Sequence, residues 1–384
     1  MLIIFLSNTY NHHQMAVSDE LYKLTNGNYY FIETQPMTEE RKKMGWLLNS
    51  QPNYVLHTYK SKEEREKCFN LIDMADVVIT AMVPESFLKT RKKMNKLIFR
   101  YSERLYKHKY MYLQIPLRII KYYFQNRKSD NIYMLCSSAY AAFDYNLSGC
   151  FKNKTFKWGY FPKTVRYNNI DKLINKKETN TILWIGRFID WKHPEIPIKL
   201  AKVLKDNGIN FKLTMVGNGR MFDDIKKLIS NFELDEYVSL LGVKTPDEIR
   251  TIMEQSQIFI FTSDYAEGWG AVLNEAMNSA CAVVVSHAVG SAPFLVEHNV
   301  NGMIYQNENI NALINNVKKL LINKKQTMDI GKKAYETIIN KWNGEIAAKN
   351  LIKLISIING NDINSIQDGP CSKAKILKNN WFKN

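Results

Sequence analysis

The sequence predicts an α/β fold built from two domains in series. Its 384 residues suit two domains at roughly 100–200 residues each. Short aliphatic and β-branched runs alternate with amphipathic segments of helical length, and the runs are apolar throughout, which is typical of parallel strands covered by helices on both faces. An apolar fraction of 45% and a charged fraction of 23% are ordinary for a globular protein.

The second half shows the alternation most clearly. Its predicted strands are Thr181–Phe188, Lys212–Gly217, Val238–Val243, Ile258–Ser263, Ala282–His287 and Gly302–Tyr305. Its predicted helices are Pro194–Asn207, Met221–Phe232, Pro246–Gln255, Gly270–Ala280, Ile310–Asn323 and Lys325–Lys353. Each strand is followed by a helical pattern, so we predict a parallel sheet with crossover helices.

The first half repeats this pattern less cleanly. Its predicted strands are Leu2–Ser7, Tyr29–Glu33, Tyr54–His57, Val77–Ala81 and Ile132–Ser137. We assign residues 1–165 to an N-terminal domain and residues 166–345 to a C-terminal domain, because a polar run resembling a linker begins at Arg166. Residues 346–384 would form a C-terminal helix and a tail that is either disordered or packed back on the first domain.

The cysteines and the start of the chain indicate the compartment. Five scattered cysteines form no CxxC pair, which argues against a zinc site or a disulfide framework. We expect Cys136 and Cys281, which lie in or beside apolar runs, to be core thiols. Met1–Ser7 lacks the basic region of a signal peptide, and no apolar stretch is long enough to span a bilayer. We therefore expect a cytoplasmic protein that can sit on the inner face of the membrane.

The net charge of +16 favours an anionic partner, which could be nucleic acid, membrane or a phosphorylated substrate. Between Glu85 and Asp130 stand thirteen cations against three anions, with aromatic residues among them. This composition predicts that the first domain docks on an anionic membrane surface. The alternative is a solvated basic face that only aids solubility.

Three loops after predicted strands contain residues suited to a phosphorylated ligand. Gly186 and Arg187 end a strand, and Lys192 stands just before a helix. Two cations beside a helix N-terminus suit a diphosphate, because ligands of open α/β sheets bind beyond the carboxyl ends of the strands. Gly217 and Gly219 follow the next strand and would let the backbone approach a ligand. A solvated basic loop and a tight turn without a ligand are the respective alternatives.

The third loop contains a pair of carboxylates, Glu267 and Glu275, separated by seven residues. Gly268, Trp269 and Gly270 stand between them, and Glu275 falls on a helix rich in alanine and methionine. Such a helix position is expected to be buried, where a carboxylate needs a partner such as a ribose hydroxyl. Taken alone, Glu275 could equally be a surface carboxylate.

Together these loops resemble the donor-binding half of glycosyltransferase family 4. The GRxxxxK element, the VGNG turn and the E-x7-E element stand in the family's order between Thr181 and Tyr305. The stretches beginning at Tyr10, Cys136 and Lys157 also resemble enzymes of bacterial surface-polysaccharide synthesis. The resemblance implies the GT-B fold, with two Rossmann-like domains facing a cleft. It also implies a retaining transferase whose donor is a nucleotide-sugar, linked to UDP or GDP, with no other cofactor.

Two departures from the family pattern concern the acceptor side. Many relatives carry a glutamate where Pro293 or Phe294 stands, and the glycine-rich loop after the first strand is replaced by Asn8–Gln14. In that loop Asn11, His12 and His13 directly follow the strand. We expect them to contact acceptor hydroxyls or donor phosphate, unless the two histidines are merely exposed.

The sequence also lacks a D-x-D motif, the carboxylate pair that many metal-dependent glycosyltransferases use. We therefore predict catalysis without metal, in which Arg187, Lys192 and the backbone amides of Gly268–Gly270 stabilise the leaving diphosphate. Glu275 would hold the ribose and Glu267 would orient the donor sugar. The alternatives are a nucleotide-sugar epimerase or a phosphorylase on the same scaffold, or a basic nucleic-acid-binding protein.

Overall fold

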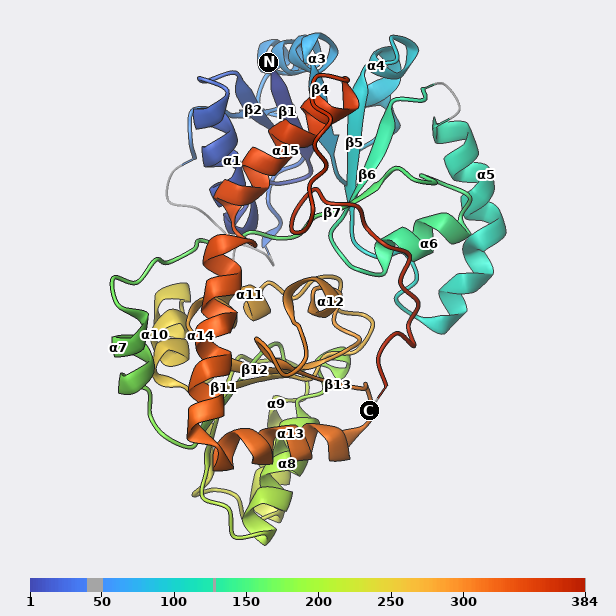
Figure 1. The fold of residues 1–384 in the computed structure, drawn as a ribbon. Coiled ribbons are helices and arrows are strands. Elements are labelled where there is room, and N and C mark those ends of the chain that lie inside the picture. The colour runs from blue at the N-terminus through green and yellow to red at the C-terminus, as the bar shows by residue number, and fades with distance from the viewer. Residues whose placement is uncertain (40–50, 127–128, 384) are drawn as a thin grey trace. The chain divides into compact units, whose positions relative to one another are not determined.

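The computed structural model describes residues 1–39, 51–126 and 129–383, and the chain divides into two compact units (Figure 1). Unit 1 comprises Met1–Lys163 and Trp342–Lys378, and unit 2 comprises Thr164–Lys341 and Asn379–Asn384. The chain therefore passes between the units at three points. The last of these returns the end of the tail to unit 2.

Unit 1 is built on a seven-stranded sheet in the order β3-β2-β1-β4-β5-β6-β7. Its strands are β1 (Ile3–Ser7), β2 (Tyr29–Glu33), β3 (Val55–His57), β4 (Val77–Thr80), β5 (Leu97–Ser102), β6 (Ile132–Cys136) and β7 (Thr155–Lys157). All neighbouring strands run parallel. The five predicted strands are confirmed. Two strands were not predicted: β7, which is three residues long, and β5, which lies inside the basic segment.

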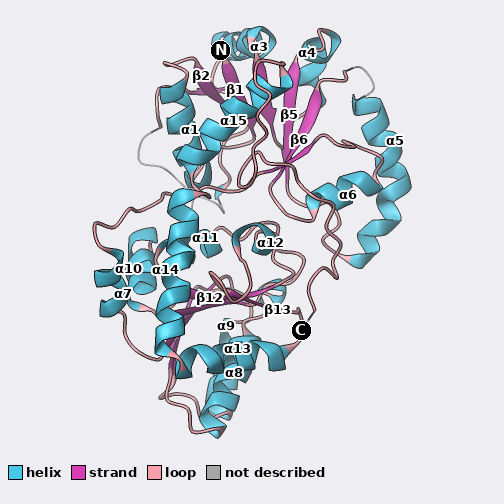
Figure 2. Ribbon diagram, in the orientation of Figure 1, coloured by secondary structure: helices cyan, strands magenta, loops and turns pink. Residues whose placement is uncertain are grey.

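Helices flank this sheet (Figure 2). They are α1 (His12–Leu24), α3 (Lys62–Met74), α4 (Lys89–Lys93), α5 (Ile115–Asn126), α6 (Ala141–Leu147) and α15 (Gly344–Ile358), with the 3-10 turns η1 (Glu85–Leu88) and η2 (Lys109–Gln114). Helix α15 packs against α1 so closely that a Cβ atom on Gly344 would lie 2.6 Å from the carbonyl carbon of Ala16. A glycine at this position therefore allows the C-terminal helix to join unit 1.

Unit 2 is built on a six-stranded sheet in the order β10-β9-β8-β11-β12-β13. Its strands are β8 (Thr181–Ile185), β9 (Lys212–Val216), β10 (Val238–Leu240), β11 (Ile258–Phe261), β12 (Ala282–Ser286) and β13 (Met303–Tyr305). All neighbours are again parallel. All six predicted strands are confirmed; the first five end one to three residues before their predicted ends, and β13 ends at Tyr305 as predicted.

The helices of unit 2 pack their apolar sides on the core around β8, β9, β11 and β12. They are α7 (Ile170–Lys176), α8 (Glu195–Asp206), α9 (Phe222–Asn231), α10 (Pro246–Gln255), α11 (Val272–Asn278), α12 (Ala292–Leu295), α13 (Ile310–Ile322) and α14 (Lys324–Asn340), with the 3-10 turn η3 (Asp190–Lys192). The prediction of a single helix over Lys325–Lys353 is wrong, because two helices, α14 and α15, cover this range. Helix α15 starts anew at Gly344, because the Asn343 side chain caps it by accepting from the Ile346 amide.

The strand order places the candidate loops. The order reverses between β8 and β11 in unit 2, and between β1 and β4 in unit 1. Open parallel sheets bind ligands beyond the carboxyl ends of the strands at such a reversal. Each unit therefore has one edge at which a ligand site is expected.

Burial and helix length bear on two other predictions. Cys136 and Cys281 are fully buried, so the prediction that they are core thiols is confirmed. Among the described residues, no helix has both the length and the apolar character needed to cross a bilayer.

Candidate active site

The loop after β8 carries the two predicted cations. Arg187 is exposed, and its guanidinium lies 5.3 Å from the centre of the Trp191 ring. Lys192 ends η3 and is half-buried, with its ammonium 5.2 Å from the centre of the Phe261 ring. The aromatic faces hold both cations beside the point where the strand order reverses.

The Lys192 ammonium is hydrogen-bonded to Oε2 of Glu267, which lies in the loop after β11. Both side chains are largely shielded, with 13% and 14% of their surface exposed. The loops after β8 and β11 therefore bring together two residues that stand 75 positions apart in the sequence. A ligand diphosphate at this edge would compete with the Glu267 carboxylate for the Lys192 ammonium.

The glycines of the loop after β9 allow its backbone to pack directly against the backbone of the loop after β8. A Cβ atom on Gly217, whose φ is +130°, would lie 2.0 Å from the Gly186 carbonyl oxygen. A Cβ atom on Gly219 would lie 2.5 Å from the Phe188 carbonyl oxygen. The loops also share a hydrogen bond from the Phe188 amide to the Asn218 carbonyl. Packing alone therefore explains Gly217 and Gly219, so a donor-binding role for them is not required by their conformation.

The loop Gly268–Gly270 is tightly constrained. Gly270 has a φ of +83°, and a Cβ atom there would lie 2.5 Å from the Phe261 ring. The Trp269 side chain is fully buried, and its indole donates a 2.9 Å hydrogen bond to Asn274 Oδ1. The indole is therefore part of the core, and the predicted donor-binding role of Trp269 stays a prediction that would involve its backbone. Only the backbone of this loop remains available to a ligand.

Glu275 lies one turn into α11 and is partly buried. Burial raises the pKa of Glu275 to about 6, and the nearby Arg250 acts in the opposite direction. Arg250 donates to the Glu275 backbone carbonyl at 3.3 Å and to Ser279 Oγ at 2.8 Å. A shielded carboxylate held near a cation is suited to accept hydrogen bonds from ligand hydroxyls.

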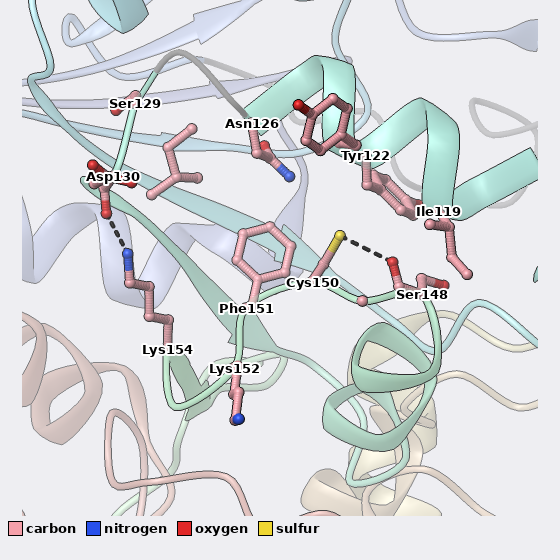
Figure 3. A pocket seen from close by; sticks show the side chains of 13 residues that line it. Ile119, Tyr122, Asn126, Ser129, Asp130, Ser148, Cys150, Phe151, Lys152 and Lys154 are labelled. Carbon is pink, nitrogen blue, oxygen red and sulfur yellow. Dashed lines mark hydrogen bonds between the residues drawn. The ribbon is translucent and has the colours of Figure 1, made fainter.

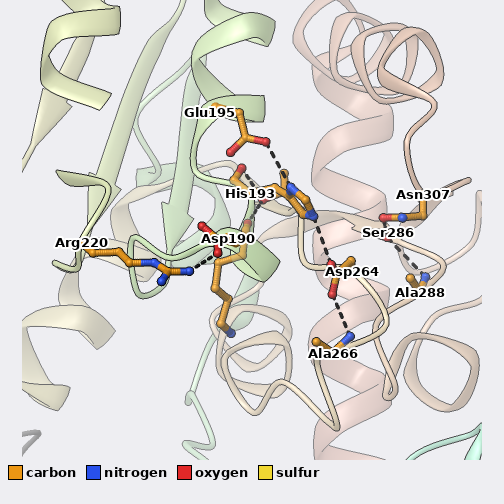
Figure 4. Close-up of polar contacts among 11 residues, drawn as sticks. Asp190, His193, Glu195, Arg220, Asp264, Ala266, Ser286, Ala288 and Asn307 are labelled. Carbon is orange, nitrogen blue, oxygen red and sulfur yellow. Dashed lines mark hydrogen bonds and ion pairs between the residues drawn. The ribbon is translucent and has the colours of Figure 1, made fainter. Parts of the chain in front are cut away.

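A second ion cluster at this edge was not predicted (Figure 4). His193 lies between two carboxylates, with Nδ1 3.1 Å from Glu195 Oε1 and Nε2 3.3 Å from Asp264 Oδ2. The hydrogen bond to Asp264, followed by the one to Glu195, raises the pKa of His193 to about 9. His193 has a φ of 51°. Nothing in the sequence pairs His193 with Asp264, which stands 71 positions later.

The predicted residues of unit 1 lie at the carboxyl end of β1. Asn11 is the N-cap of α1, and its side chain accepts from the His13 amide at 3.0 Å. The His13 ring stacks on Tyr160 with centroids 5.5 Å apart. Burial lowers the pKa of His13 to about 3 and also lowers the pKa of His12. Both imidazoles are therefore neutral near pH 7, so they can hydrogen-bond to hydroxyl groups but do not attract phosphate by charge.

The neighbouring ends of β2 and β3 hold a buried carboxylate–imidazole cluster that the sequence analysis missed. Glu33 Oε1 accepts from the Tyr10 amide, and Glu33 Oε2 lies 3.1 Å from His57 Nε2. The other His57 nitrogen lies 3.2 Å from Glu64 Oε1. Alternating strand residues gave no hint of this cluster, because it forms only when β2 and β3 pair.

The chain thus forms an α/β protein with two parallel Rossmann-like sheets, and cations and carboxylates lie where the strand order of the second sheet reverses. Residues 165–337 match the family described as glycosyl transferases group 1. Unit 2 therefore belongs to this family, which is the family 4 that the motifs predicted.

Solved structures show the fold of the whole chain. HepE of Anabaena, solved in complex with UDP, has a TM-score of 0.69 and 15% identity, covering 93% of this chain and 100% of that one. The lipopolysaccharide outer core galactosyltransferase WaaB has a TM-score of 0.67 and 15% identity, covering 94% and 100%. These similarities confirm the predicted GT-B fold.

Curated relatives share sequence with less of the chain. The poly(ribitol-phosphate) α-N-acetylglucosaminyltransferase of Staphylococcus aureus is 30% identical over 174 residues, which are 45% of this chain and 34% of that protein. The amylovoran biosynthesis glycosyltransferase AmsK of Erwinia amylovora is 28% identical over 179 residues, which are 45% and 44%. The matches thus span less than half the length of these two relatives.

Proposed function

We propose that this protein is a retaining glycosyltransferase that moves a sugar from a nucleotide-sugar to a glycan or lipid-linked acceptor in surface polysaccharide synthesis. The observation that carries the proposal is the hydrogen bond between Lys192 and Glu267, which joins the loops after β8 and β11 where the strand order reverses, within the region that matches the family. Similar proteins bear names that refer to poly(ribitol-phosphate), amylovoran and lipopolysaccharide. Those names support a polymeric surface glycan as the product.

The cations and the carboxylates of this edge have different roles in the proposed reaction. Arg187 and Lys192 stabilise the negative charge that develops on the leaving diphosphate, together with the amides of Gly268–Gly270. Preorganised charge of this kind can lower a barrier by about 3–4 kcal/mol for each donor group. Glu275 accepts hydrogen bonds from the ribose. Glu267 leaves Lys192 when the diphosphate binds and then orients the donor sugar.

We further propose that the sugar keeps its anomeric configuration through attack from the face that the diphosphate leaves. No enzyme carboxylate then forms a covalent bond with the sugar. In unit 1, the neutral imidazoles of His12 and His13 contact acceptor hydroxyls, and the Asn11 cap holds that loop in place.

The nucleotide is identified by a thermal-shift screen with UDP, GDP, ADP and CMP sugars. A ligand at 100 times its dissociation constant adds about 2.7 kcal/mol of stability, which gives a clear rise in melting temperature. We expect a UDP- or GDP-sugar to stabilise the protein, in keeping with UDP in the HepE structure. Equal melting temperatures with all four nucleotide classes would contradict the donor assignment.

The reaction class is tested by product analysis with and without acceptor. A glycosyltransferase forms a new glycoside only when acceptor is present. A changed donor sugar without acceptor would indicate an epimerase, and a sugar phosphate formed with inorganic phosphate would indicate a phosphorylase. Salt-sensitive DNA binding without any donor turnover would favour the nucleic-acid-binding alternative.

We also propose that unit 1 docks on an anionic membrane surface, where a lipid-linked acceptor is presented. The basic segment supports this with fewer free charges than the sequence suggested. The Arg91 guanidinium is fully buried and donates to the carbonyls of Ile72, Ala75, Asp76 and Leu97. Lys92 and Arg100 both bind Glu85. Residues 127 and 128 lie outside the described residues.

A further inference from the structure

The helix α5 and the turn η2 before it expose an apolar stripe. Of the eighteen large apolar side chains that are exposed in the described part of the chain, seven lie between Tyr110 and Phe124. Leu113, Leu117, Ile120 and Phe124 are 84%, 71%, 56% and 56% exposed. The spacing of the last three places them along one side of α5, and Leu113 precedes them in η2. Monomeric proteins seldom expose so concentrated an apolar patch unless it binds something.

The charged residues around the stripe are all cations, which favours an anionic partner. The segment from Lys109 to Asn126 contains the cations Lys109, Arg118 and Lys121 and no acidic residue. A short helix with an apolar side, aromatic residues and flanking cations is typical of segments that lie in the headgroup region of an anionic bilayer. At 12 residues, α5 is too short to span one.

A cavity of about 330 Å³ adjoins the same helix (Figure 3). Ile119, Tyr122 and Tyr123 of α5 line one wall, and Ile132 and Phe151 lie among the residues of the other. Lys152 and Lys154 also line it. The lining also includes the acidic Asp130, so the cavity combines apolar side chains with two cations and one carboxylate. Two of its lining residues, Ile119 and Tyr123, are among the exposed side chains of α5.

The wall opposite α5 is held in an unusual backbone conformation. Gly149, Phe151 and Asn153 have φ angles of 70°, 55° and 60°, a left-handed region that bulky residues such as phenylalanine rarely adopt. The Phe151 ring packs edge-on against Tyr145, with centroids 5.5 Å apart. Strained residues of this kind are concentrated at ligand sites, where the surrounding packing maintains them.

A buried polar atom also borders the cavity. The side-chain oxygen Oδ1 of Asn126 has no hydrogen-bond partner within the described residues, and Asn126 lines the cavity. A buried acceptor without a partner is costly. A ligand hydroxyl, such as that of a glycerol headgroup, would satisfy it.

We propose that η2, α5 and the adjoining cavity form a binding site for an anionic glycerophospholipid of the membrane. The stripe lies at headgroup level, one hydrocarbon chain enters the cavity, and Lys121 and Lys152 neutralise the phosphate. The inference rests on the proposed membrane docking of unit 1. It assigns the docking to α5 rather than to Arg91 and Lys92 of α4 and Arg100 of β5, which are engaged within the unit.

Vesicle binding tests the stripe. We expect the full chain to co-sediment with phosphatidylglycerol vesicles at low salt and much less with phosphatidylcholine vesicles. Leu117→Glu and Phe124→Glu should each weaken binding about tenfold or more. Ile363→Glu is the matched control, because Ile363 is 96% exposed in unit 1 but lies outside the stripe. Equal binding to both vesicle types, or stripe variants that bind like the control, would overturn the proposal.

Protection of Cys150 tests the cavity. Cys150 lines it and is half-buried, whereas the other four cysteines are buried. Because burial raises the pKa of Cys150 to about 11, alkylation by iodoacetamide is followed at about pH 9. A Cys150→Ser variant gives the background.

We expect monomeric dihexanoyl-phosphatidylglycerol to slow this alkylation about tenfold at saturation, and glycerol phosphate, which has no chain, to leave it unchanged. Equal rates with and without the short-chain lipid would show that no chain enters the cavity. Thermal stabilisation by a nucleotide-sugar, measured in the same samples without lipid, reports on the donor site. Failure of the lipid site and failure of the proposed transferase are thus separately visible.

Discussion

The two units share one strand topology but present different chemistry where the strand order reverses. At the edge of β8 and β11, unit 2 gathers Arg187, Lys192 and Glu267 around tightly packed glycines. At the edge of β1 and β4, unit 1 presents Asn11 and His13, and burial keeps the imidazole neutral. The first edge suits an anionic diphosphate and the second suits neutral sugar hydroxyls. Topology thus sets where a ligand can bind, and the loops decide which ligand it is.

The largest expected effect tests the charged edge. Arg187→Ala and Lys192→Ala should each lower turnover about 100- to 1000-fold, because each removes a preorganised positive charge from the leaving diphosphate. Turnover of the unchanged protein should persist in excess EDTA. Activity that disappears in EDTA and returns with manganese or magnesium would show that a metal ion, rather than Arg187 and Lys192, stabilises the leaving diphosphate.

The next effect tests the glycine packing of that edge. Gly217→Ala should lower the free energy of unfolding by about 2–4 kcal/mol, because the new methyl group would overlap the Gly186 carbonyl. Gly149→Ala is the matched control, since its φ is +70° but nothing lies within 4 Å of the added atom. Denaturant unfolding of both variants gives the comparison, and equal losses would show that backbone conformation, not close packing, requires Gly217.

Donor affinity tests the carboxylate on α11. Glu275→Ala should weaken nucleotide-sugar binding about ten- to a hundredfold while the fold survives, since hydrogen bonds to a charged group are worth roughly 1.5–3 kcal/mol. Isothermal titration calorimetry measures the change. An unaltered dissociation constant would remove Glu275 from the donor site.

The pH dependence of stability gives a related test without ligand. The folded protein holds the pKa of Glu275 at about 6, above the value of 4.5 for a free glutamate. This group therefore contributes stability below about pH 4.5 that is lost as the pH rises through 6. Glu275→Gln should raise the stability of the free protein by about 2 kcal/mol at pH 8 and by little near pH 4. A gain that is independent of pH would contradict the raised pKa.

The smallest effect tests the neutral edge of unit 1. His13→Ala should raise the KM for the acceptor about tenfold, the value expected for loss of one hydrogen bond, and should leave donor affinity unchanged. His108→Ala serves as the control, because His108 is exposed and lies away from β1. A change in donor affinity with no change in acceptor KM would assign His13 to the donor instead.

Sequence reasoning located most of unit 2 because its strands are continuous apolar runs. It missed β5, whose register places Arg100 opposite Thr80 of β4. A cation inside a short apolar run is typical of an exposed segment, so the run was not interpreted as a buried strand. Sequence reasoning also joined α14 and α15 into one helix, since the Asn343 cap interrupts an otherwise continuous helical pattern. The first failure arose because neighbouring strands, rather than the segment itself, decide that β5 forms. The second arose because a single capping residue ends a pattern that helical periodicity alone would continue.

The motifs predicted that Arg187, Lys192 and Glu267 follow strands of the second sheet and that Glu275 lies on the helix after β11, because residues that follow parallel strands emerge at one edge of the sheet. The same motifs assigned Trp269 to the donor, although its indole fills the core and binds Asn274. A sequence motif cannot tell a side chain that faces a ligand from one that supports the loop.

By itself, the sequence determined the two α/β units, the family of unit 2 and the loops that carry its charges, since apolar periodicity and loop composition are local properties. Only the tertiary structure decided which charges are free. It buried Arg91 among four carbonyls and placed His193 between Glu195 and Asp264. It also left the stripe of α5 exposed. Burial and pairing depend on contacts between residues far apart in the chain, and no local pattern encodes them.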